Sequence, residues 1–212
     1  MPSLLKQMKE EKSKGGRMFA LIRHFETPMN DENKARGWLP TPIDPSEYED
    51  AYDLGEELRG EIDYIVASDL LRTLQTAHYV SLGSKAPIIK ITPFLHTWNI
   101  GKYTGEPTKK VDPILEKLAV QDPDKNIDNG ESFNQFKYRF LLGVISTLNE
   151  CEGTIAFVTH GRNLAVMNAW REENYNDDLD VSDDHLGYEE FGPGTATFFN
   201  INSPLLKTHV LP

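Results

Sequence analysis

The sequence predicts an α/β protein with a mostly parallel central sheet. Short apolar runs alternate along the 212 residues with longer segments whose apolar side chains recur at helical spacing. This alternation is typical of strands that are connected by helices. The short runs are continuous rather than alternating, as expected for strands buried on both faces. No repeat, low-complexity tract or flexible linker divides the chain, so we expect a single domain.

Five strands and four helices account for most of this pattern. We expect strands at residues 18–22, 62–67, 88–91, 154–158 and 195–201. We expect helices at residues 46–59, 69–82, 132–149 and 162–171. In the first of these helices the apolar face is formed by Tyr48, Ala51, Tyr52, Gly55 and Leu58. Residues 1–16 carry four lysines and are expected to be a charged N-terminal extension, a frayed and solvated helix rather than a partner-binding face.

Composition and charge exclude several classes of protein. Hydrophobic residues make up 39% and charged residues 26% of the chain, which is ordinary for a folded domain and argues against disorder. The 33 acidic and 22 basic side chains give a net charge of −11, which argues against a nucleic-acid partner. The apolar runs are far shorter than the ~20 residues of a membrane span, so no membrane partner is expected. Cys151 is the single cysteine and no apolar leader segment is seen, which favours the cytoplasm.

Much of the negative charge is concentrated in one segment. Residues 172–190 contain nine acidic side chains and no lysine or arginine, so the rest of the chain carries 24 acidic against 22 basic residues. We interpret this segment as an acidic insertion that forms a solvated loop. A second hypothesis is that it borders the functional pocket, where it selects substrates with a cationic part or supplies an acid.

Charged side chains follow three of the predicted strands, close to the point where each strand ends. Arg23 and His24 follow the first strand, Arg72 lies just beyond the second, and His160 follows the fourth. The carboxyl ends of parallel strands meet at one edge of a sheet, so we expect these four side chains to converge. Guanidinium groups bind phosphate oxygens in pairs, and a neutral imidazole can attack phosphorus. The sequence therefore predicts a pocket for a tetrahedral dianion that supports phosphoryl transfer.

Four segments, in order along the chain, resemble the motifs of the histidine phosphatase superfamily, the phosphoglycerate mutase-like group. Residues 23–30 read Arg-His-Phe-Glu-Thr-Pro-Met-Asn, which is similar to the family signature Arg-His-Gly-Glu-Thr-x-x-Asn. Residues 68–77, Ser-Asp-Leu-Leu-Arg-Thr-Leu-Gln-Thr-Ala, resemble Ser-x-Leu-x-Arg-Ala-x-Gln-Thr-Ala. Residues 130–132 with Arg139 resemble a third block, and residues 158–161 a fourth. The resemblance implies a three-layer α/β/α sandwich, phosphoglycerate mutase-like, and a phosphomonoesterase activity.

The resemblance also implies a role for each matching residue. His24 would be the nucleophile that becomes phosphorylated, and the phosphate pocket would be formed by Arg23, Arg72 and His160. Substrate-binding roles are expected for Thr27, Asn30, Gly161 and Arg162. The first two would position the transferring group or a neighbouring loop, and the glycine would open a helix toward the phosphate. The role of Arg162 is inferred from its place after His160, where it either reaches a distal anionic group of the substrate or is an exposed helix arginine. The family requires no metal. For this chain we expect no cofactor, and a small-molecule phosphate ester as the partner.

Two positions depart from the family pattern. Phe25 replaces the glycine that usually follows the nucleophile, and its ring either adds bulk where the backbone passes near the phosphate or packs inward. Thr97 occupies the place of the glutamate that serves as the general acid, and a threonine hydroxyl cannot donate a proton near neutral pH. His96 is a possible proton donor, because an imidazole titrates near neutral pH. The other candidates for this role are Asp69, Glu106 and Glu131.

Three functions are compatible with these motifs. The first is a phosphomonoester hydrolase that works through a phosphohistidine, with an atypical or missing general acid. The second is a cofactor-dependent phosphoglycerate mutase, which uses the same pocket but retains the phosphate; the sequence lacks the distinctive segment of such mutases near the acid. The third is a phosphate-binding scaffold that has lost catalysis, since Thr97 leaves the acid position empty. No motif selects a particular substrate or an oligomeric state.

Overall fold

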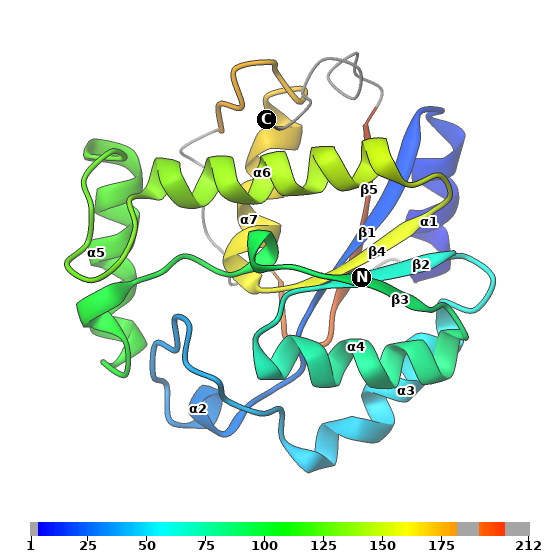
Figure 1. The fold of residues 1–212 in the computed structure, drawn as a ribbon, viewed down its shortest axis with the longest axis horizontal. Helices are drawn as coiled ribbons and strands as arrows, with labels where there is room; N and C mark the ends of the chain where they lie inside the picture. Colours follow the sequence, from blue (N-terminus) through cyan, green and yellow to red (C-terminus); the bar gives the residue numbers. More distant parts are fainter. Residues whose placement is uncertain (1–3, 182–190, 202–212) are drawn as a thin grey trace.

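A five-stranded sheet with the order β3-β2-β4-β1-β5 forms the centre of the protein. The computed structural model describes residues 4–181 and 191–201, and Figure 1 shows their arrangement. The strands are β1 (Arg17–Arg23), β2 (Tyr64–Ala67), β3 (Ile88–Ile91), β4 (Ile155–Thr159) and β5 (Ala196–Ile201). β1, β2, β3 and β4 run parallel to one another, and β5 runs antiparallel to its neighbour β1.

The strand register brings the functional ends of the parallel strands to one edge of the sheet. Arg23 at the end of β1 pairs with Thr159 at the end of β4, and Ala67 at the end of β2 pairs with Val158. The segments that follow these three strands therefore start side by side. This is the edge at which open α/β sheets bind their ligands.

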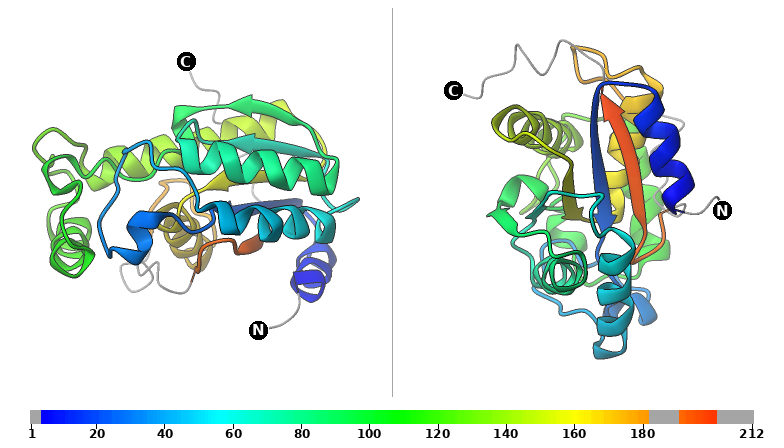
Figure 2. Two further views of the ribbon diagram at one scale, coloured as in Figure 1. Left: turned by 90° about the horizontal axis from the view of Figure 1, so that it is seen from below. Right: turned by 90° about the vertical axis from the view of Figure 1, so that its right-hand side faces the viewer.

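Helices cover both faces of the sheet, so the predicted three-layer α/β/α sandwich is confirmed. The described helices are α1 (Leu4–Ser13), α2 (Pro28–Asp31), α3 (Tyr48–Glu57), α4 (Leu71–Ser84), α5 (Thr108–Gln121), α6 (Phe133–Glu150) and α7 (Gly161–Glu172). In Figure 1, α6 lies above the sheet, and α3 and α4 lie below it. Figure 2 shows α1 beside β5, and α5 standing apart at one end of the molecule.

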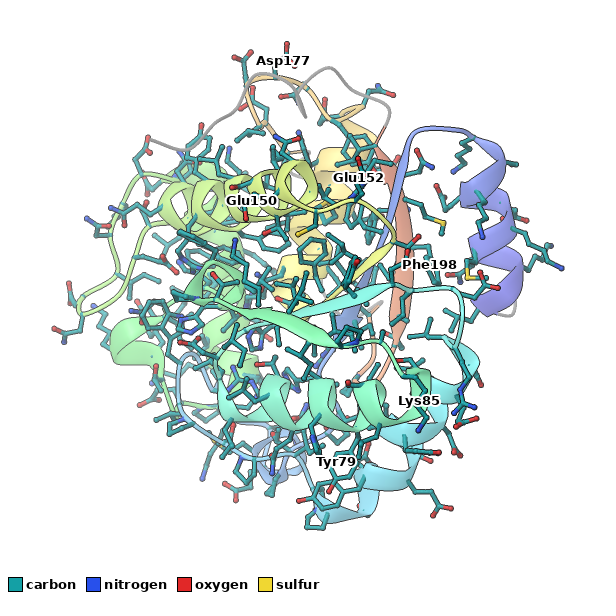
Figure 3. All side chains as sticks on the ribbon, turned by 45° about the vertical axis from the view of Figure 1, so that its right-hand side comes forward. Tyr79, Lys85, Glu150, Glu152, Asp177 and Phe198 are labelled. Atoms are coloured by element: carbon teal, nitrogen blue, oxygen red, sulfur yellow. The ribbon has the colours of Figure 1, made fainter. Side chains whose placement is uncertain are left out.

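Two apolar clusters, one on each face, hold the layers together. Along β1, Phe19 and Leu21 face the layer that contains α6 and α7, whereas Ala20 and Ile22 face α1 and α4. All four side chains are fully buried. Strands that are covered on both sides must be apolar at every position, which explains the continuous runs in the sequence. Phe198 on β5, labelled in Figure 3, belongs to the cluster on the α1 side.

The predicted strands agree with the structure to within two residues at each end, and all four predicted helices are present. α5 was not predicted. Its buried residues Val111, Leu115 and Ala119 recur every four positions, but Pro113 stands inside the helix and reads as a helix breaker in the sequence. No element was therefore assigned from the sequence to the segment where the structure places a helix of 14 residues.

Two finer expectations about helix faces are corrected. The helix α1 is not merely solvated, because the side chain of Met8 is buried in the same apolar cluster as Met18 and Phe198. Tyr52 does not lie on the buried face of α3; its side chain is exposed and its hydroxyl lies 2.9 Å from a carboxylate oxygen of Glu56. Amphipathic periodicity cannot decide such border positions, because a tyrosine is stable on either side of the boundary.

Glycines allow α3 and α4 to pack with their backbones nearly in contact. A Cβ atom at Gly83 would lie 2.1 Å from the carbonyl oxygen of Tyr52, and one at Gly55 would lie 2.4 Å from that of Val80. Both distances are far below any van der Waals contact. Close packing of these helices therefore requires glycine at both positions.

Candidate active site

The two histidines selected from the sequence lie together at the carboxyl edge of the sheet. His24 directly follows β1 and His160 directly follows β4, and their ring centroids are 5.3 Å apart with the rings inclined at 63°. Both side chains are buried. They form the floor of a cleft of about 510 Å³, a volume that includes the part open to solvent. The residues that line it are Arg23, His24, Lys34, Ala35, Arg36, Gly37, Arg72, Thr97, Trp98, Ile100, Thr108, Asp112, His160, Gly161 and Arg162.

The hydrogen bonds of His24 define which ring nitrogen is available for reaction. Its Nδ1 lies 2.7 Å from the carbonyl oxygen of Phe25. Because a carbonyl oxygen only accepts hydrogen bonds, Nδ1 carries the proton and Nε2 carries a lone pair. Burial, followed by the positive charges of Arg72 and Arg36, lowers the pKa of His24 well below its ordinary value of 6.5. The imidazole is therefore neutral at physiological pH, which is the form that a nucleophile requires.

His160 is held in a similar environment. Its Nε2 lies 3.3 Å from the hydroxyl of Ser68, the residue that follows β2, and within the described residues its Nδ1 has no hydrogen-bond partner. Burial, followed by the electrostatic effects of Arg72 and of the neighbouring His24 ring, lowers its pKa well below 6.5. The site thus contains two neutral imidazoles beside guanidinium groups, a combination that leaves the positive charge available to an incoming anion.

Arg72 connects α4 to the loop that closes one side of the cleft. Its Nη1 donates to the carbonyl oxygen of Leu39 at 2.8 Å, and its Nη2 donates to that of Gly37 at 2.8 Å. Its Nε has no partner within the described residues. Burial lowers the pKa of Arg72 to about 9, so the guanidinium is still charged at neutral pH. The charge is fixed in place before any ligand arrives, which favours tight binding of an anion.

Thr27 and Asn30 do not line the cleft; they hold another arginine that does. The Oγ1 of Thr27 lies 2.7 Å from Oδ1 of Asn30, and together the two residues cap the short helix α2. Arg36 donates to the same Oδ1 and lies 3.3 Å from the Thr27 hydroxyl. Of the two roles expected for the pair, the positioning of a neighbouring loop is the one that this geometry fits. Arg36 itself was missed, because it stands in a loop with no spacing rule to identify it.

Gly161 and Arg162 begin α7 and line the cleft, as expected from the sequence. Arg162 forms an ion pair with Asp112 on α5, with Nη2 and Oδ1 2.6 Å apart. Asp112 was also missed, because α5 was not predicted. Arg23 lies on the same floor, and its Nη1 donates to the carbonyl oxygen of Phe191.

Arg139 on α6 fixes the segment that carries Thr97. Its guanidinium donates to both carboxylate oxygens of Glu131. It also donates to four backbone carbonyl oxygens of that segment, those of Pro93, Phe94, His96 and Thr97. Glu131 also accepts a hydrogen bond of 2.8 Å from the backbone N–H of Asn99. The third motif block of the sequence thus supports the cleft wall, and its carboxylate is fully engaged there.

The structure places the other candidate proton donors away from the cleft lining. Nε2 of His96 is hydrogen-bonded to Asp69, and its ring packs edge-on against Trp38 with centroids 4.6 Å apart. Burial lowers the pKa of His96, an effect that the neighbouring Asp69 opposes. Glu106 pairs at the surface with Lys110, at 2.8 Å. His96 as the donor stays a prediction.

Of the two arrangements left open for Phe25, the structure shows the ring packed inward. The ring is buried with Ile43 and Ala51, and a Cβ atom on Gly194 would lie 2.5 Å from it. The phenylalanine thus replaces the usual glycine without filling the cleft, since it is not one of the lining residues.

The acidic segment 172–190 is described only as far as residue 181, and residues 182–190 lie outside the described part of the chain. The described acids beyond α7 are exposed, and none lines the cleft. They follow the far end of α7, about 18 Å from its start at the site, because 12 helical residues rise 1.5 Å each. Figure 3 shows Asp177 on this distant loop. For these residues a solvated loop fits better than a border of the pocket.

The charge of the cleft differs from that of the whole chain. The side chains that line it include five cations, Arg23, Lys34, Arg36, Arg72 and Arg162, and among the described residues one carboxylate, Asp112. A cleft with this lining attracts anions although the chain carries a net charge of −11. Within the described ranges there is no cluster of three or more His, Cys, Asp or Glu side chains that could hold a metal ion. None of the helices described here has the length and apolarity needed to cross a bilayer.

The fold and the site together define an α/β protein with two neighbouring buried histidines in a cleft at the carboxyl edge of its sheet. The model of the histidine phosphatase superfamily (branch 1) matches residues 19–179. The chain belongs to this family. The match contains all four motif segments and both histidines of the cleft.

Curated relatives carry the names of both mutases and phosphatases. The chain is 29% identical over 147 residues to "Probable phosphoglycerate mutase GpmB" of Enterobacter sp. (strain 638), covering 66% of this chain and 68% of that protein. It is 27% identical over 144 residues to "Uncharacterized phosphatase PhoE" of Bacillus subtilis, covering 66% and 70%. It is 28% identical over 173 residues to "Broad-specificity phosphatase YOR283W" of Saccharomyces cerevisiae, covering 73% and 70%.

Solved structures share the fold. YhfR of Bacillus stearothermophilus matches with a TM-score of 0.72 and 28% identity, covering 88% of this chain and 92% of that one. The mycobacterial glucosyl-3-phosphoglycerate phosphatase Rv2419c, in complex with VO3, matches with a TM-score of 0.65 and 20% identity, covering 86% and 92%. The second likeness shows the fold alone. The family and these relatives support phosphatase or mutase chemistry.

Proposed function

We propose that this protein is a metal-independent phosphomonoester hydrolase that acts on small-molecule phosphate esters through a phosphohistidine on His24. The observation that carries the proposal is the hydrogen bond of 2.7 Å from Nδ1 of His24 to a backbone carbonyl, which leaves Nε2 as a buried, neutral nucleophile. Arg23, Arg72 and His160 lie in the same cleft. The single thiol of the chain, Cys151, fits a reducing cytoplasm.

The reaction runs in two displacements at phosphorus. Nε2 of His24 attacks, the bond from phosphorus to the ester oxygen breaks, and the leaving oxygen takes a proton from an acidic group of the cleft or from water. Arg23 and Arg72 stabilise the negative charge on the equatorial oxygens of the transferring phosphoryl group. The backbone N–H groups at the start of α7 do the same, as does His160 when it shares a proton with one of these oxygens. Water then attacks the phosphohistidine, which releases inorganic phosphate and restores the imidazole.

A mutase is the second candidate, because the GpmB relative carries that name and would use the same cleft. The two functions differ in the fate of the phosphoryl group. A hydrolase releases inorganic phosphate from a monoester without any primer. A mutase interconverts the two monophosphoglycerates, and only after priming by the bisphosphate. A scaffold, the third alternative, does neither.

The experiment measures inorganic phosphate released from p-nitrophenyl phosphate and from an alkyl phosphate, with His24→Asn as the comparison. We expect release by the wild type and a loss of at least about 10³-fold in the variant, since a nucleophile has been removed. Isomerisation of phosphoglycerates that depends on the bisphosphate, without net phosphate release, would instead assign the mutase. Full activity in His24→Asn would refute the mechanism.

A further inference from the structure

Ser68 places a hydroxyl against the second histidine of the cleft. The serine directly follows β2, is fully buried, and has its Oγ 3.3 Å from Nε2 of His160. It is not one of the residues that line the cleft, so its contact with the site runs through the imidazole. The serine begins the second motif segment of the sequence, where no role was assigned to it.

Three hydrogen bonds hold Ser68 in place. Its backbone N–H donates to the carbonyl oxygen of Val158 on β4 at 3.1 Å, and its own carbonyl oxygen accepts a hydrogen bond of 2.9 Å from the hydroxyl of Thr73 on α4. The backbone N–H of Leu70 donates to Oγ at 3.4 Å. Because Ser68 is tied both to β4 and to the start of α4, its hydroxyl is fixed beside the ring of His160, which itself follows β4.

The direction of the hydrogen bond between Ser68 and His160 follows from the groups around it. An N–H group only donates, so the N–H of Leu70 uses a lone pair of Oγ and leaves the hydroxyl proton for an acceptor. Among the described residues, Nε2 of His160 is the acceptor within reach of that proton. A buried hydroxyl proton without an acceptor is unfavourable, so the hydroxyl donates and Nε2 accepts. His160 is neutral, because burial lowers its pKa, and its ring proton therefore lies on Nδ1.

The protonated Nδ1 of His160 is a buried donor in the same cleft as Arg72. Both this Nδ1 and the Nε of Arg72 are buried and have no hydrogen-bond partner in the part of the chain that the structure describes. Both residues line the cleft that contains His24, whose ring centroid lies 5.3 Å from that of His160. A phosphoryl group on Nε2 of His24 carries negatively charged oxygens, which are acceptors for such N–H groups. The opposite tautomer of His160 would present a lone pair to those oxygens and repel them.

We propose that Ser68 is a positioning residue that sets the tautomer of His160. Its hydroxyl donates to Nε2, the ring proton stays on Nδ1, and this N–H donates to an oxygen of the transferring phosphoryl group. The last of these statements rests on the hydrolase function proposed for this site. His160 stays neutral throughout, and its hydrogen bond to the phosphoryl oxygen strengthens as negative charge builds up there in the transition state.

NMR reads the tautomer directly. Long-range ¹H–¹⁵N correlation spectra of protein labelled at its histidines distinguish the protonated from the unprotonated ring nitrogen, and the signals lost in His160→Asn identify that ring. At neutral pH we expect the proton on Nδ1 in the wild type and in Ser68→Thr, which keeps the hydroxyl. We expect it to move toward Nε2 in Ser68→Ala, because nothing then donates to that nitrogen. A proton on Nε2 in the wild type, or an unchanged tautomer in Ser68→Ala, would overturn the proposal.

Kinetics test what the tautomer contributes to the reaction. We expect Ser68→Ala to lower kcat for p-nitrophenyl phosphate by about 10-fold or more, with a smaller change in KM, because the N–H acts mainly in the transition state. Ser68→Thr should recover most of this loss. Ser84→Ala is the matched control with no expected effect on kcat, because it removes another buried hydroxyl at the far end of α4, where Oγ donates to the carbonyl oxygen of Val80.

Other outcomes separate this role from packing and from the function of the site. Equal losses of kcat in Ser68→Ala and Ser68→Thr, at equal thermal unfolding midpoints, would assign the effect to packing and overturn the proposal. Ser68→Cys, which has a similar size but a weak donor, takes the place of Ser68→Ala if that variant does not fold, with the same expected shift of the proton. If the wild type forms no phosphohistidine, the hydrolase function fails. A proton on Nδ1 that moves in Ser68→Ala would still support the role of Ser68 in setting the tautomer.

Discussion

Replacing Arg139 with methionine removes the guanidinium that connects α6 to the wall of the active-site cleft. The substitution keeps most of the side-chain volume but deletes every donor. Four backbone carbonyls and the carboxylate of Glu131 lose a partner. The cost depends on which of these groups can find another donor.

The structure shows that the carboxylate bears most of the cost. The carbonyl of Thr97 keeps a hydrogen bond of 2.8 Å from Trp38, and that of His96 keeps one of 3.1 Å from Asn163. Glu131, with 14% of its side chain exposed, is left as a charge without a cation. Stranding one member of a buried ion pair costs about 3–5 kcal/mol, and the partial exposure places this case near 3 kcal/mol. For a chain of this size that corresponds to a fall in Tm of about 6–12 °C.

The assay is urea unfolding of the wild type, Arg139→Met, Glu131→Gln and the double variant. We expect Glu131→Gln to restore more than half of the loss caused by Arg139→Met, because it removes the stranded charge. A loss below about 1 kcal/mol in Arg139→Met, or strict additivity of the two changes, would refute the reasoning about this ion pair.

Three further predictions test other parts of the structure. The pKa values of His24 and His160 lie well below 6.5, so the folded protein binds fewer protons than the unfolded chain. The free energy of unfolding should therefore fall as the pH drops below 6.5. NMR titration should show both rings neutral at pH 6.5. Gly83→Ala would bring a Cβ 2.1 Å from the backbone of α3 and should cost at least about 1–3 kcal/mol in urea unfolding, whereas Gly192→Ala meets its nearest atom at 3.6 Å and should cost little. Phe140→Ala empties a fully buried site on α6 and should cost about 3–5 kcal/mol of unfolding free energy. A much smaller loss, as when solvent fills the cavity and the variant tolerates it, would contradict this prediction.

The sheet and the histidine pair could be predicted because both depend on local signals. Continuous apolar runs identify strands covered on both faces, and polar residues at the ends of parallel strands must lie at one edge. His24, Arg72 and His160 were found in this way, and the structure brings them into one cleft.

The remaining part of the cleft depends on tertiary contacts that leave no local pattern. Asp112 reaches the cleft because α5 packs Val111 on the core, and a proline inside that helix hides it from periodicity. Arg36 is placed by hydrogen bonds to Thr27 and Asn30, which the spacing of an irregular loop does not encode. A sequence motif locates the groups that react, and the chain's own packing decides which others surround them.

The measurement that tests the central claim most directly is the trapping of the phosphoenzyme. The protein is mixed with a phosphate ester, quenched in alkali within milliseconds, digested and analysed by mass spectrometry for phosphorylated peptides. We predict an acid-labile, alkali-stable phosphoryl group on His24 that is absent from His24→Asn and that accumulates when the second displacement is slowed. A phosphoryl group on another residue would contradict the account. Turnover without any detectable phosphoenzyme would also contradict it, if no quench time shows the intermediate in a burst experiment in which the alcohol is released quickly.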